Sequence, residues 1–308
     1  MEYKKNRVIG IGGANMDVHM KVAGDYILHD SNPGKLLLSP GGVTRNILEN
    51  LSRLGRYCSI ISAVGTDVFG DAIIDSCEEA GVDTKMVYRT GNHLTSSYLS
   101  LIDGRGDMYV AACDAQILET MDIANVEKFK DCIFDYDAVV MDTNWTEEQL
   151  KELDSVCKGL PVFIDPVSTE KAKRMKDISG RFYMIKPNRM ELEVLSGMEC
   201  LTEKDIEAAC KVLISKGTFA VAVSLGENGC YYADAKGNSF FKEPRKVEEM
   251  VNASGAGDAF MAGLVHSFLE GYGPEKTVDT ALACGRIAVM SKETINPHMS
   301  AALVEENI

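Results

Sequence analysis

Short apolar runs and amphipathic helical patterns alternate along most of this 308-residue chain, and this alternation restricts the fold more than any other feature. The apolar runs, bounded by Gly, Pro or Asn, lie at residues 8–12, 58–64, 138–141, 162–164, 182–185 and 219–225. Several are continuous, which is typical of strands covered on both faces. The helical patterns lie at residues 44–54, 67–80, 146–157, 188–196, 202–216, 256–269 and 275–291. We therefore expect an α/β fold with a mostly parallel central sheet and helices on both sides.

Two stretches break the alternation, at about residues 18–39 and 96–112. Each contains two strand-like pieces, the first around a polar loop at 30–34 and the second around a Gly-rich turn at 103–106. We expect these four pieces to form a small second sheet that lies over the main one as a lid. Because no linker, low-complexity tract or repeat divides the sequence, we interpret residues 1–308 as a single domain.

The composition argues against several classes of protein. With 46 acidic and 32 basic side chains the net charge is −14, which is unfavourable for nucleic-acid binding. No apolar run approaches the roughly 20 residues that cross a bilayer, and the N-terminus shows no signal peptide. The nine Cys form no Cys-x-x-Cys pair, which argues against a disulfide framework or a zinc site. We expect a cytoplasmic protein without nucleic-acid or membrane partners.

The sequence Ser254-Gly255-Ala256-Gly257-Asp258 opens one of the helical patterns. Small residues let the backbone approach a ligand closely, and the first N–H groups of a helix are free donors, so this segment can cradle an anion. A carboxylate beside a bound phosphate is repelled unless it has a chemical task, and Asp258 could deprotonate an attacking hydroxyl. The alternative is an ordinary helix cap by Ser254 or Asp258.

Two further segments follow predicted strands. In Lys186-Pro187-Asn188-Arg189-Met190-Glu191, the spacing of Asn188 and Glu191 fits a capping box. The same two side chains could instead hold Mg²⁺ and its waters beside bound phosphates. The segment 224–229, Ser-Leu-Gly-Glu-Asn-Gly, is either a hairpin-like turn or a glycine-lined floor for a nucleotide.

The segment Gly10-Ile11-Gly12-Gly13-Ala14-Asn15-Met16-Asp17 imitates a dinucleotide-binding fingerprint but lacks its third glycine, and a strand pattern follows where a helix is required. Asp17 is interpreted as an acceptor for vicinal sugar hydroxyls, or else as an exposed turn residue. In the segment 41–46, Gly-Gly-Val-Thr-Arg-Asn, Asn46 could reach a ligand or serve in an ordinary helix start. The chain contains neither a P-loop nor the protein-kinase motifs, so phosphoryl transfer would need another architecture.

Four of these motifs, in this order, resemble the ribokinase-like family of carbohydrate kinases: residues 12–17, 41–46, 188–191 and 255–258. The likeness covers nearly the whole chain. It implies a three-layer sandwich with a β-sheet lid and an enzyme that uses ATP and Mg²⁺ to phosphorylate a hydroxymethyl group. By this resemblance Asp258 is the catalytic base, and Gly255, Ala256 and Gly257 form the anion hole.

The resemblance also assigns the other site residues. Glu191 binds Mg²⁺ through water. The resemblance places Asn188 beside the phosphates, and we expect further nucleotide contacts at Lys186, Ser224, Gly226, Gly229, Asn252, Gly255 and Gly257. The sugar contacts are Asn15, Asp17, Gly42 and Asn46. Many family members carry an acid where this chain has Asn252, and this difference puts a monovalent-cation site in question. Ribokinases carry Glu where this chain has Asn144, which argues against ribose as the substrate.

Further stretches resemble the branch of the family that acts on pseudouridine: residues 30–35, 39–47, 95–100, 165–168 and 186–189. This resemblance implies pseudouridine as the acceptor, phosphorylated at its 5′-hydroxyl. The alternatives are another nucleoside or sugar, such as uridine, ribose or fructose, or an inactive ligand-binding regulator. Candidate contacts to the base are Ser31, Asn32, Thr95, Ser96, Ser97, Asn144 and Lys171. Exposed lid edges favour a homodimer through the lid.

Overall fold

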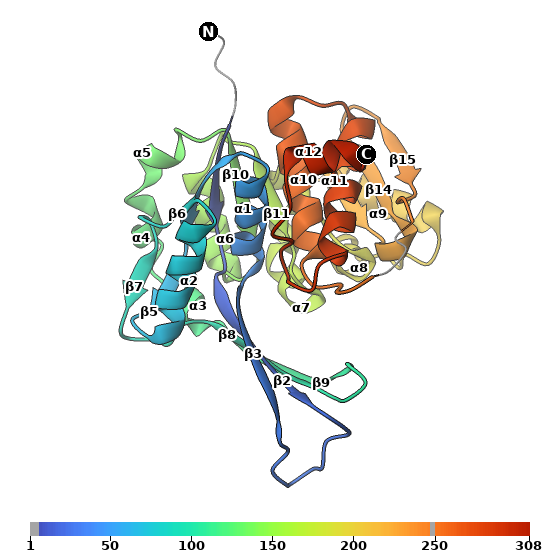
Figure 1. Ribbon diagram of the computed structural model, residues 1–308. Helices are drawn as coiled ribbons and strands as arrows, with labels where there is room; N and C mark the ends of the chain where they lie inside the picture. The colour runs from blue at the N-terminus through green and yellow to red at the C-terminus, as the bar shows by residue number, and fades with distance from the viewer. Residues whose placement is uncertain (1–5, 247–249) are drawn as a thin grey trace.

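The computed structural model describes residues 6–246 and 250–308, and a large central sheet dominates it (Figure 1). Among these residues nine strands form the sheet, in the order β15-β14-β13-β12-β11-β10-β1-β4-β6. Their bounds are β1 Arg7–Ile11, β4 Tyr57–Ile61, β6 Val82–Asp83, β10 Ala138–Asp142, β11 Val162–Asp165, β12 Met184–Ile185, β13 Ala220–Ser224, β14 Cys230–Asp234 and β15 Ser239–Lys242. The pairings from β6 to β13 are parallel and the last two are antiparallel. The mostly parallel sheet is confirmed.

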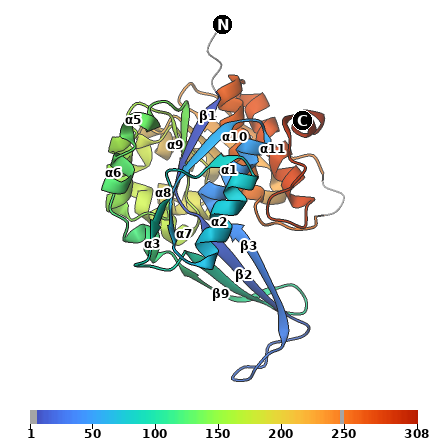
Figure 2. The same cartoon turned by 60° about the vertical axis from the view of Figure 1, so that its left-hand side comes forward.

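Helices cover both faces of this sheet (Figures 1 and 2). The longer ones are α1 Val43–Arg53, α2 Val68–Glu79, α6 Glu147–Val156, α8 Arg189–Ser196, α9 Glu203–Ser215, α10 Ala256–Glu270, α11 Pro274–Val289 and α12 Ala301–Glu306. The other helical segments are α3 Gln116–Glu119, α4 Ala124–Glu127, α5 Lys130–Ile133, α7 Thr169–Ala172 and the 3₁₀ segments Lys173–Arg181 and Gly226–Asn228. Apolar residues of α1, α10 and α11 share one buried cluster, and those of α6, α8 and α9 share another. The three-layer sandwich is therefore confirmed.

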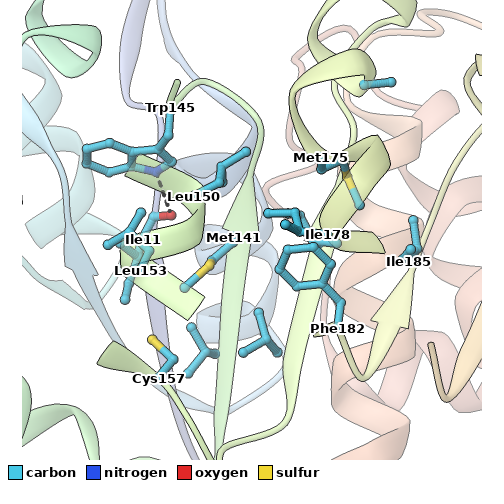
Figure 3. Close-up of a cluster of buried hydrophobic side chains, with 14 of the residues drawn as sticks. Ile11, Met141, Trp145, Leu150, Leu153, Cys157, Met175, Ile178, Phe182 and Ile185 are labelled. Atoms are coloured by element: carbon cyan, nitrogen blue, oxygen red, sulfur yellow. Dashed lines mark hydrogen bonds between the residues drawn. The ribbon is translucent and has the colours of Figure 1, made fainter. Parts of the chain in front are cut away.

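Alternation along the strands explains how one sheet supplies both clusters. Val139 and Met141 belong to the α6 side, whereas Ala138 and Val140 belong to the α1 side, because successive side chains point to opposite faces. On the α6 side the buried Trp145 donates from Nε1 to the Ile11 carbonyl at 3.2 Å (Figure 3). This hydrogen bond and the surrounding apolar side chains show that Trp145 is a packing residue.

The two irregular stretches form a separate sheet of four strands, as expected. These are β2 Asn15–Val22, β3 Gly34–Gly41, β8 Ser97–Ile102 and β9 Met108–Asp114, in the order β3-β2-β8-β9. The expectation that this lid lies over the main sheet was wrong in detail: it projects from the body (Figures 1 and 2). Only residues 12–14 separate β1 from β2, so the chain leaves the central sheet at the end of β1 and continues outward.

Other boundaries also differ from the expected ones. The run at 58–64 is divided between β4 of the central sheet and β5 Ala63–Gly65, which pairs with β7 Tyr88–Thr90 in a two-stranded sheet. Uniform apolar character hides this division, because periodicity does not show where a strand leaves its sheet. In the part of the chain that the structure describes, no helix combines the length and apolar character that crossing a membrane requires.

Candidate active site

Charged side chains lie where three neighbouring parallel strands end. Asp142 is the last residue of β10, Asp165 is the last residue of β11, and Lys186 follows β12 directly. All three side chains are buried. Because parallel strands end at the same edge of a sheet, this edge is where open α/β folds bind ligands.

Helix α10 begins at this edge and carries Asp258 in its first turn. Its N-cap is Gly255, with a left-handed φ of 77°, and no side-chain cap bond occurs among the described residues. The helix-cap interpretation of Ser254 and Asp258 is therefore wrong. A Cβ on Gly255 would lie 2.0 Å from the Thr294 carbonyl oxygen, so both the backbone angle and the space require glycine here. The N-terminal N–H groups of α10 thus remain available for an anion.

The Asp258 carboxyl group is held by one amide. Its Oδ2 accepts a hydrogen bond from Asn46 Nδ2 at 2.8 Å, which joins the starts of α10 and α1. Burial, with a smaller contribution from the Asp165 carboxylate, raises the pKa of Asp258 from 3.8 to about 7, while Asn46 and Lys186 act in the opposite direction. A carboxylate with a pKa near neutrality is well matched to general-base catalysis.

This shift predicts opposite pH dependences for activity and stability. If Asp258 is the base, kcat should fall about tenfold per pH unit below about pH 7, because the protonated carboxyl cannot accept a proton. The folded state binds this proton more tightly than the unfolded chain does, so its contribution to stability is full below about pH 4 and is lost as the pH rises through about 7. Saturating kinetics and denaturant melts between pH 4 and 9 measure both trends, and D258N should remove the second.

Lys186 forms a buried ion pair beneath the start of α10. Its Nζ lies 2.9 Å from Asp165 Oδ2, and the two side chains are only 7% and 5% exposed. Burial lowers the pKa of Lys186, but the Asp165, Glu191 and Asp258 carboxylates outweigh it and raise the pKa above its ordinary value. A Cβ on Gly257 would lie 3.1 Å from Lys186 Nζ. The structure therefore brings Lys186 to the anion cradle, where we predicted a nucleotide contact.

Asp17 lies in the lid strand β2, against Gly41 just before α1. It pairs with Ser39 of β3 and Tyr98 of β8, so the exposed-turn interpretation is wrong. Asn15 Nδ2 donates to Asp17 Oδ1 at 2.6 Å. Burial raises the pKa of Asp17 above its ordinary value, although Asn15 and nearby cations oppose the shift. An oriented carboxylate of this kind suits a pair of sugar hydroxyls.

Glycine at two positions allows the loops around Asp17 to meet. A Cβ on Gly41 would lie 2.4 Å from Asp17 Oδ2. Gly42 has a φ of 102°, and a Cβ there would lie 2.5 Å from the Gly13 carbonyl oxygen. The loops 12–17 and 41–46 are consequently in direct backbone contact.

Asp142 organises these loops, and it was not among the predicted site residues. Its Oδ2 accepts hydrogen bonds from Gly13 N at 2.8 Å, Thr44 N at 3.1 Å and Thr44 Oγ1 at 2.8 Å. Its Oδ1 accepts from Asn144 N at 3.0 Å. The predicted strand ended one residue too early, at 141. An acid that closes a fully apolar run is the signal that would have identified it.

Asn144 and Lys171 meet beside Gly13. Lys171 Nζ donates to Asn144 Oδ1 at 2.5 Å. A Cβ on Gly13 would lie 2.5 Å from Asn144 Nδ2, so the amide nitrogen covers the glycine loop. Both residues were predicted as acceptor contacts, and the structure places them together at the end of β10.

Asn188 and Glu191 form the complete capping box of α8. Asn188 Oδ1 accepts from Glu191 N at 2.9 Å, and Glu191 Oε2 accepts from Asn188 N at 2.8 Å. These two hydrogen bonds confirm the capping interpretation. They do not exclude a role in magnesium binding, because the other carboxylate oxygen of Glu191, Oε1, takes no part in the capping box. Burial, followed by the charge of Asp165, raises the pKa of Glu191. A carboxylate in such surroundings favours a nearby cation.

The remaining predicted nucleotide contacts lie around Asn188. Ser224 bridges to Asn188, with Ser224 N donating to the Pro187 carbonyl at 2.9 Å. Gly226 borders open space, whereas a Cβ on Gly229 would lie 2.0 Å from the Lys242 carbonyl oxygen, so Gly229 also has a packing role in the β14–β15 hairpin. Asn252 shapes the loop before Gly255: its Nδ2 donates to the Lys292 carbonyl at 3.2 Å, and its Oδ1 accepts from Ser254 N.

The predicted base contacts divide into two groups. Ser31 and Asn32 lie in the loop beyond the Val22–Gly34 pair, at the far end of the lid, so the structure does not bring them to the other site residues (Figure 1). Thr95 is committed elsewhere: its hydroxyl donates to Asp67 at 2.7 Å and accepts from Gly65 N.

Ser96 and Ser97 are at the near end of the lid, beside the strand that carries Asp17. Ser96 accepts from Met16 N through its carbonyl, and Ser97 pairs with Met16 in the sheet. The Ser97 hydroxyl donates to the Thr95 carbonyl at 3.1 Å. The buried Ser96 hydroxyl has no hydrogen-bond partner among the described residues.

Comparisons with known proteins agree with this geometry. The profile of the pfkB family of carbohydrate kinases matches residues 5–301. The chain belongs to the pfkB carbohydrate kinase family. It is accordingly a phosphotransferase with an alcohol group as acceptor.

Two relatives and one solved structure are similar to the chain over most of its length. It is 35% identical to the pseudouridine kinase of Escherichia coli over 98% of this chain and 96% of that protein. It is 32% identical to the E. coli uncharacterized sugar kinase YeiI, over 94% and 80% of the two chains. An Arabidopsis thaliana ribokinase structure, complexed with ribose and ATP, superimposes with a TM-score of 0.87 at 19% identity, covering 98% of both chains. This last likeness confirms the ribokinase-like fold.

Proposed function

We propose that this pfkB kinase transfers the γ-phosphoryl group of ATP to the 5′-hydroxyl of pseudouridine, giving pseudouridine 5′-phosphate and ADP. The observation that supports it best is the Asn46–Asp258 contact, which joins an anion cradle at α10 to the sugar-side residues around Asp17. Similarity to a pseudouridine kinase over almost the whole chain supports the choice of acceptor. Alternative acceptors are uridine, ribose or fructose.

In this proposal each half of the site has a defined task. Asp17, Gly42 and Asn46 bind the ribose hydroxyls, and Asp258 takes the proton from the 5′-hydroxyl as it attacks. The first N–H groups of α10, at Gly255 to Gly257, stabilise the charge of the transferred phosphoryl group. Lys186 lies under this cradle as a buried cation. Binding both reactants in line is the main source of rate in such transfers.

The residues present fit Mg²⁺ bound mainly by ATP phosphates and water. Between residues 6 and 246 and from 250 onward, no cluster of three or more acidic, His or Cys side chains could hold a metal by itself. Mg²⁺ characteristically keeps several waters and uses one or two carboxylates with substrate phosphates, and Glu191 is one such carboxylate. Mg²⁺ would neutralise charge on the phosphates.

Recognition of the base requires a group that distinguishes the two uridine isomers. Pseudouridine presents an additional ring N–H where uridine has C–H. An acceptor that pairs with this N–H is left unpaired by uridine, which costs about 1–3 kcal/mol. The Ser96 hydroxyl, which has no hydrogen-bond partner among the described residues, and the Asn144–Lys171 pair are the candidates.

A side-by-side assay tests the acceptor. Pseudouridine, uridine, ribose and fructose are supplied with ATP and Mg²⁺, and ADP release is measured. We expect uridine to be at least about tenfold poorer than pseudouridine in kcat/KM, from the energy range above. Ribose should also be poor because it lacks the base. If another acceptor exceeds pseudouridine, the kinase assignment stands but this substrate is wrong, and no turnover with any acceptor would favour a ligand-binding regulator.

The metal role predicts that E191Q raises the Mg²⁺ concentration needed for half-maximal rate. Gln retains an oxygen that can accept from Asn188 N, so the capping box survives while the charge is lost. We expect an increase of about tenfold, typical of weakened support for a metal site. A magnesium titration at fixed ATP measures it, with E193Q on the same helix as the control. An unchanged titration would leave Glu191 with the capping role alone.

We further propose a cytoplasmic homodimer that pairs through the lid. Leu36, Leu37 and Leu38 of β3 are 51%, 42% and 52% exposed, and successive strand residues face opposite sides, so both faces of this edge strand present apolar surface. An exposed strand edge also offers unpaired backbone groups to a second chain.

A further inference from the structure

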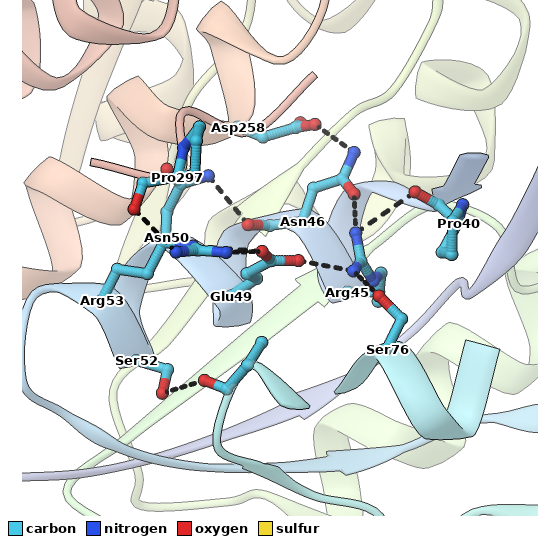
Figure 4. Close-up of polar contacts among 11 residues, drawn as sticks. Pro40, Arg45, Asn46, Glu49, Asn50, Ser52, Arg53, Ser76, Asp258 and Pro297 are labelled. Atoms are coloured by element: carbon cyan, nitrogen blue, oxygen red, sulfur yellow. Dashed lines mark hydrogen bonds and ion pairs between the residues drawn. The ribbon is translucent and has the colours of Figure 1, made fainter. Parts of the chain in front are cut away.

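The side chain next to Asn46 has a set of contacts that the proposed reaction does not use. Arg45 is 4% exposed and lies between α1, α2 and the end of the lid strand β3 (Figure 4). Its Nη1 donates to Asn46 Oδ1 at 3.0 Å and to the Pro40 carbonyl at 3.2 Å. Its Nη2 donates to Ser76 Oγ at 2.7 Å and forms an ion pair with Glu49. One guanidinium thus contacts four acceptors on three elements.

These contacts determine which way the Asn46 amide faces. A guanidinium has donors and no acceptor, so only the Asn46 oxygen can lie against it. The amide nitrogen must then point to the opposite side, where Nδ2 donates to Asp258 Oδ2 at 2.8 Å. The reverse orientation would place the amide oxygen against a carboxylate and the amide N–H groups against a cation. Arg45 therefore selects the orientation in which Asn46 donates to Asp258.

We infer that Arg45 is a positioning residue that holds the Asn46 amide as a donor to Asp258 and thereby favours the ionised form of that carboxylate. The inference rests on the proposed role of Asp258 as the catalytic base. A hydrogen bond to the charged form of an acid favours that form. Lysine cannot substitute fully, because a single ammonium lacks the planar fork that holds Asn46, Pro40, Ser76 and Glu49 together.

Other charged groups face Asp258 and limit the size of the effect. Asp142 at the end of β10 and Asp165 at the end of β11 oppose its ionisation, whereas Lys186 after β12 favours it. These three come from elements that Arg45 does not touch. Loss of Arg45 should therefore leave the effects of Asp142, Asp165 and Lys186 on the Asp258 carboxyl unchanged. It should alter only the part that depends on the hydrogen bond from Asn46.

The direct test is a titration of the Asp258 carboxyl group in the resting protein. Aspartate labelled with ¹³C at the carboxyl carbon is incorporated, and the Asp258 signal is assigned by its absence in D258N. Because R45M alone would leave Glu49 short of a partner, the comparison uses the E49Q background. R45M/E49Q is set against R53M/E49Q, since Arg53 binds the same Glu49 side chain and the Pro297 carbonyl but does not contact Asn46.

We expect R45M/E49Q to raise the titration midpoint of Asp258 by about 0.5–1 pH unit, with R53M/E49Q unchanged. The acidic limb of kcat should move by the same amount. N46A should raise the midpoint by less in R45M/E49Q than it does in E49Q, because part of the Asn46 contribution depends on Arg45. Equal midpoints for the two Arg variants, or shifts that add, would overturn the inference. The carboxyl titration needs no turnover, so it decides the role of Arg45 even if D258N shows that Asp258 is not the base.

Discussion

Replacing Asp258 by Asn is expected to lower kcat by about 10²–10⁴, the range typical of losing a general base. The amide keeps the size of the side chain but cannot accept the hydroxyl proton. The variant is expected to fold even if its contact with Asn46 changes. Above about pH 7 the wild-type protein holds a charged carboxylate at this position, and burial disfavours that charge, which the Asn side chain does not carry. Rapid-quench or coupled kinetics at saturating ATP and acceptor measure the loss.

Two controls separate this chemical role from a general disturbance. ATP binding, measured calorimetrically with a non-hydrolysable analogue, should change little in D258N because the α10 N–H groups remain. The matched variant D154N removes an acid that pairs with Arg181 at the surface, and it should retain full activity. A D258N enzyme with near-normal kcat would exclude Asp258 as the base.

The sheet and its helices were predictable because each depends on local pattern. Continuous apolar runs gave the buried parallel strands, and the helical period gave the layers that cover them. The lid strands were also predicted, but not the direction in which they project. That direction depends on the short connection at residues 12–14, whose course in space no periodicity encodes.

The site was predictable where chemistry is concentrated in a motif, and it was missed where chemistry depends on tertiary contacts. Asp258 and Asn46, far apart in sequence, were each recognised from their own segments, and the structure joins them. Asp142 and Arg45 were not recognised. Asp142 and Arg45 both act by holding other groups in place through hydrogen bonds. Their partners come from distant segments of the chain, which only the fold brings together. Ser31 and Asn32 are the opposite case. They were predicted as contacts to the base, but the fold places them at the far end of the lid, away from the other site residues.

Replacing Lys186 by Met should lower the free energy of unfolding by about 3–5 kcal/mol, the range for removing one partner of a buried ion pair. The buried Asp165 side chain would lose its cationic partner, with Glu191 and Asp258 as further acidic groups near the lost ammonium. Urea denaturation of the ligand-free protein measures the change.

A pair of variants decides whether charge causes this loss. K211M removes the ammonium of an exposed pair with Glu207, whose side chains are 68% and 41% exposed, and it should cost at most about 0.5 kcal/mol. K186M/D165N removes both buried charges and should recover much of the stability, since an apolar or neutral replacement of a whole buried pair is often well tolerated. It should not recover activity, because the cation beneath the α10 cradle is still absent. Stability restored without activity would show that the buried Lys186–Asp165 pair serves catalysis more than folding, whereas no recovery of stability would mean that the aliphatic packing of Lys186 matters more than its charge.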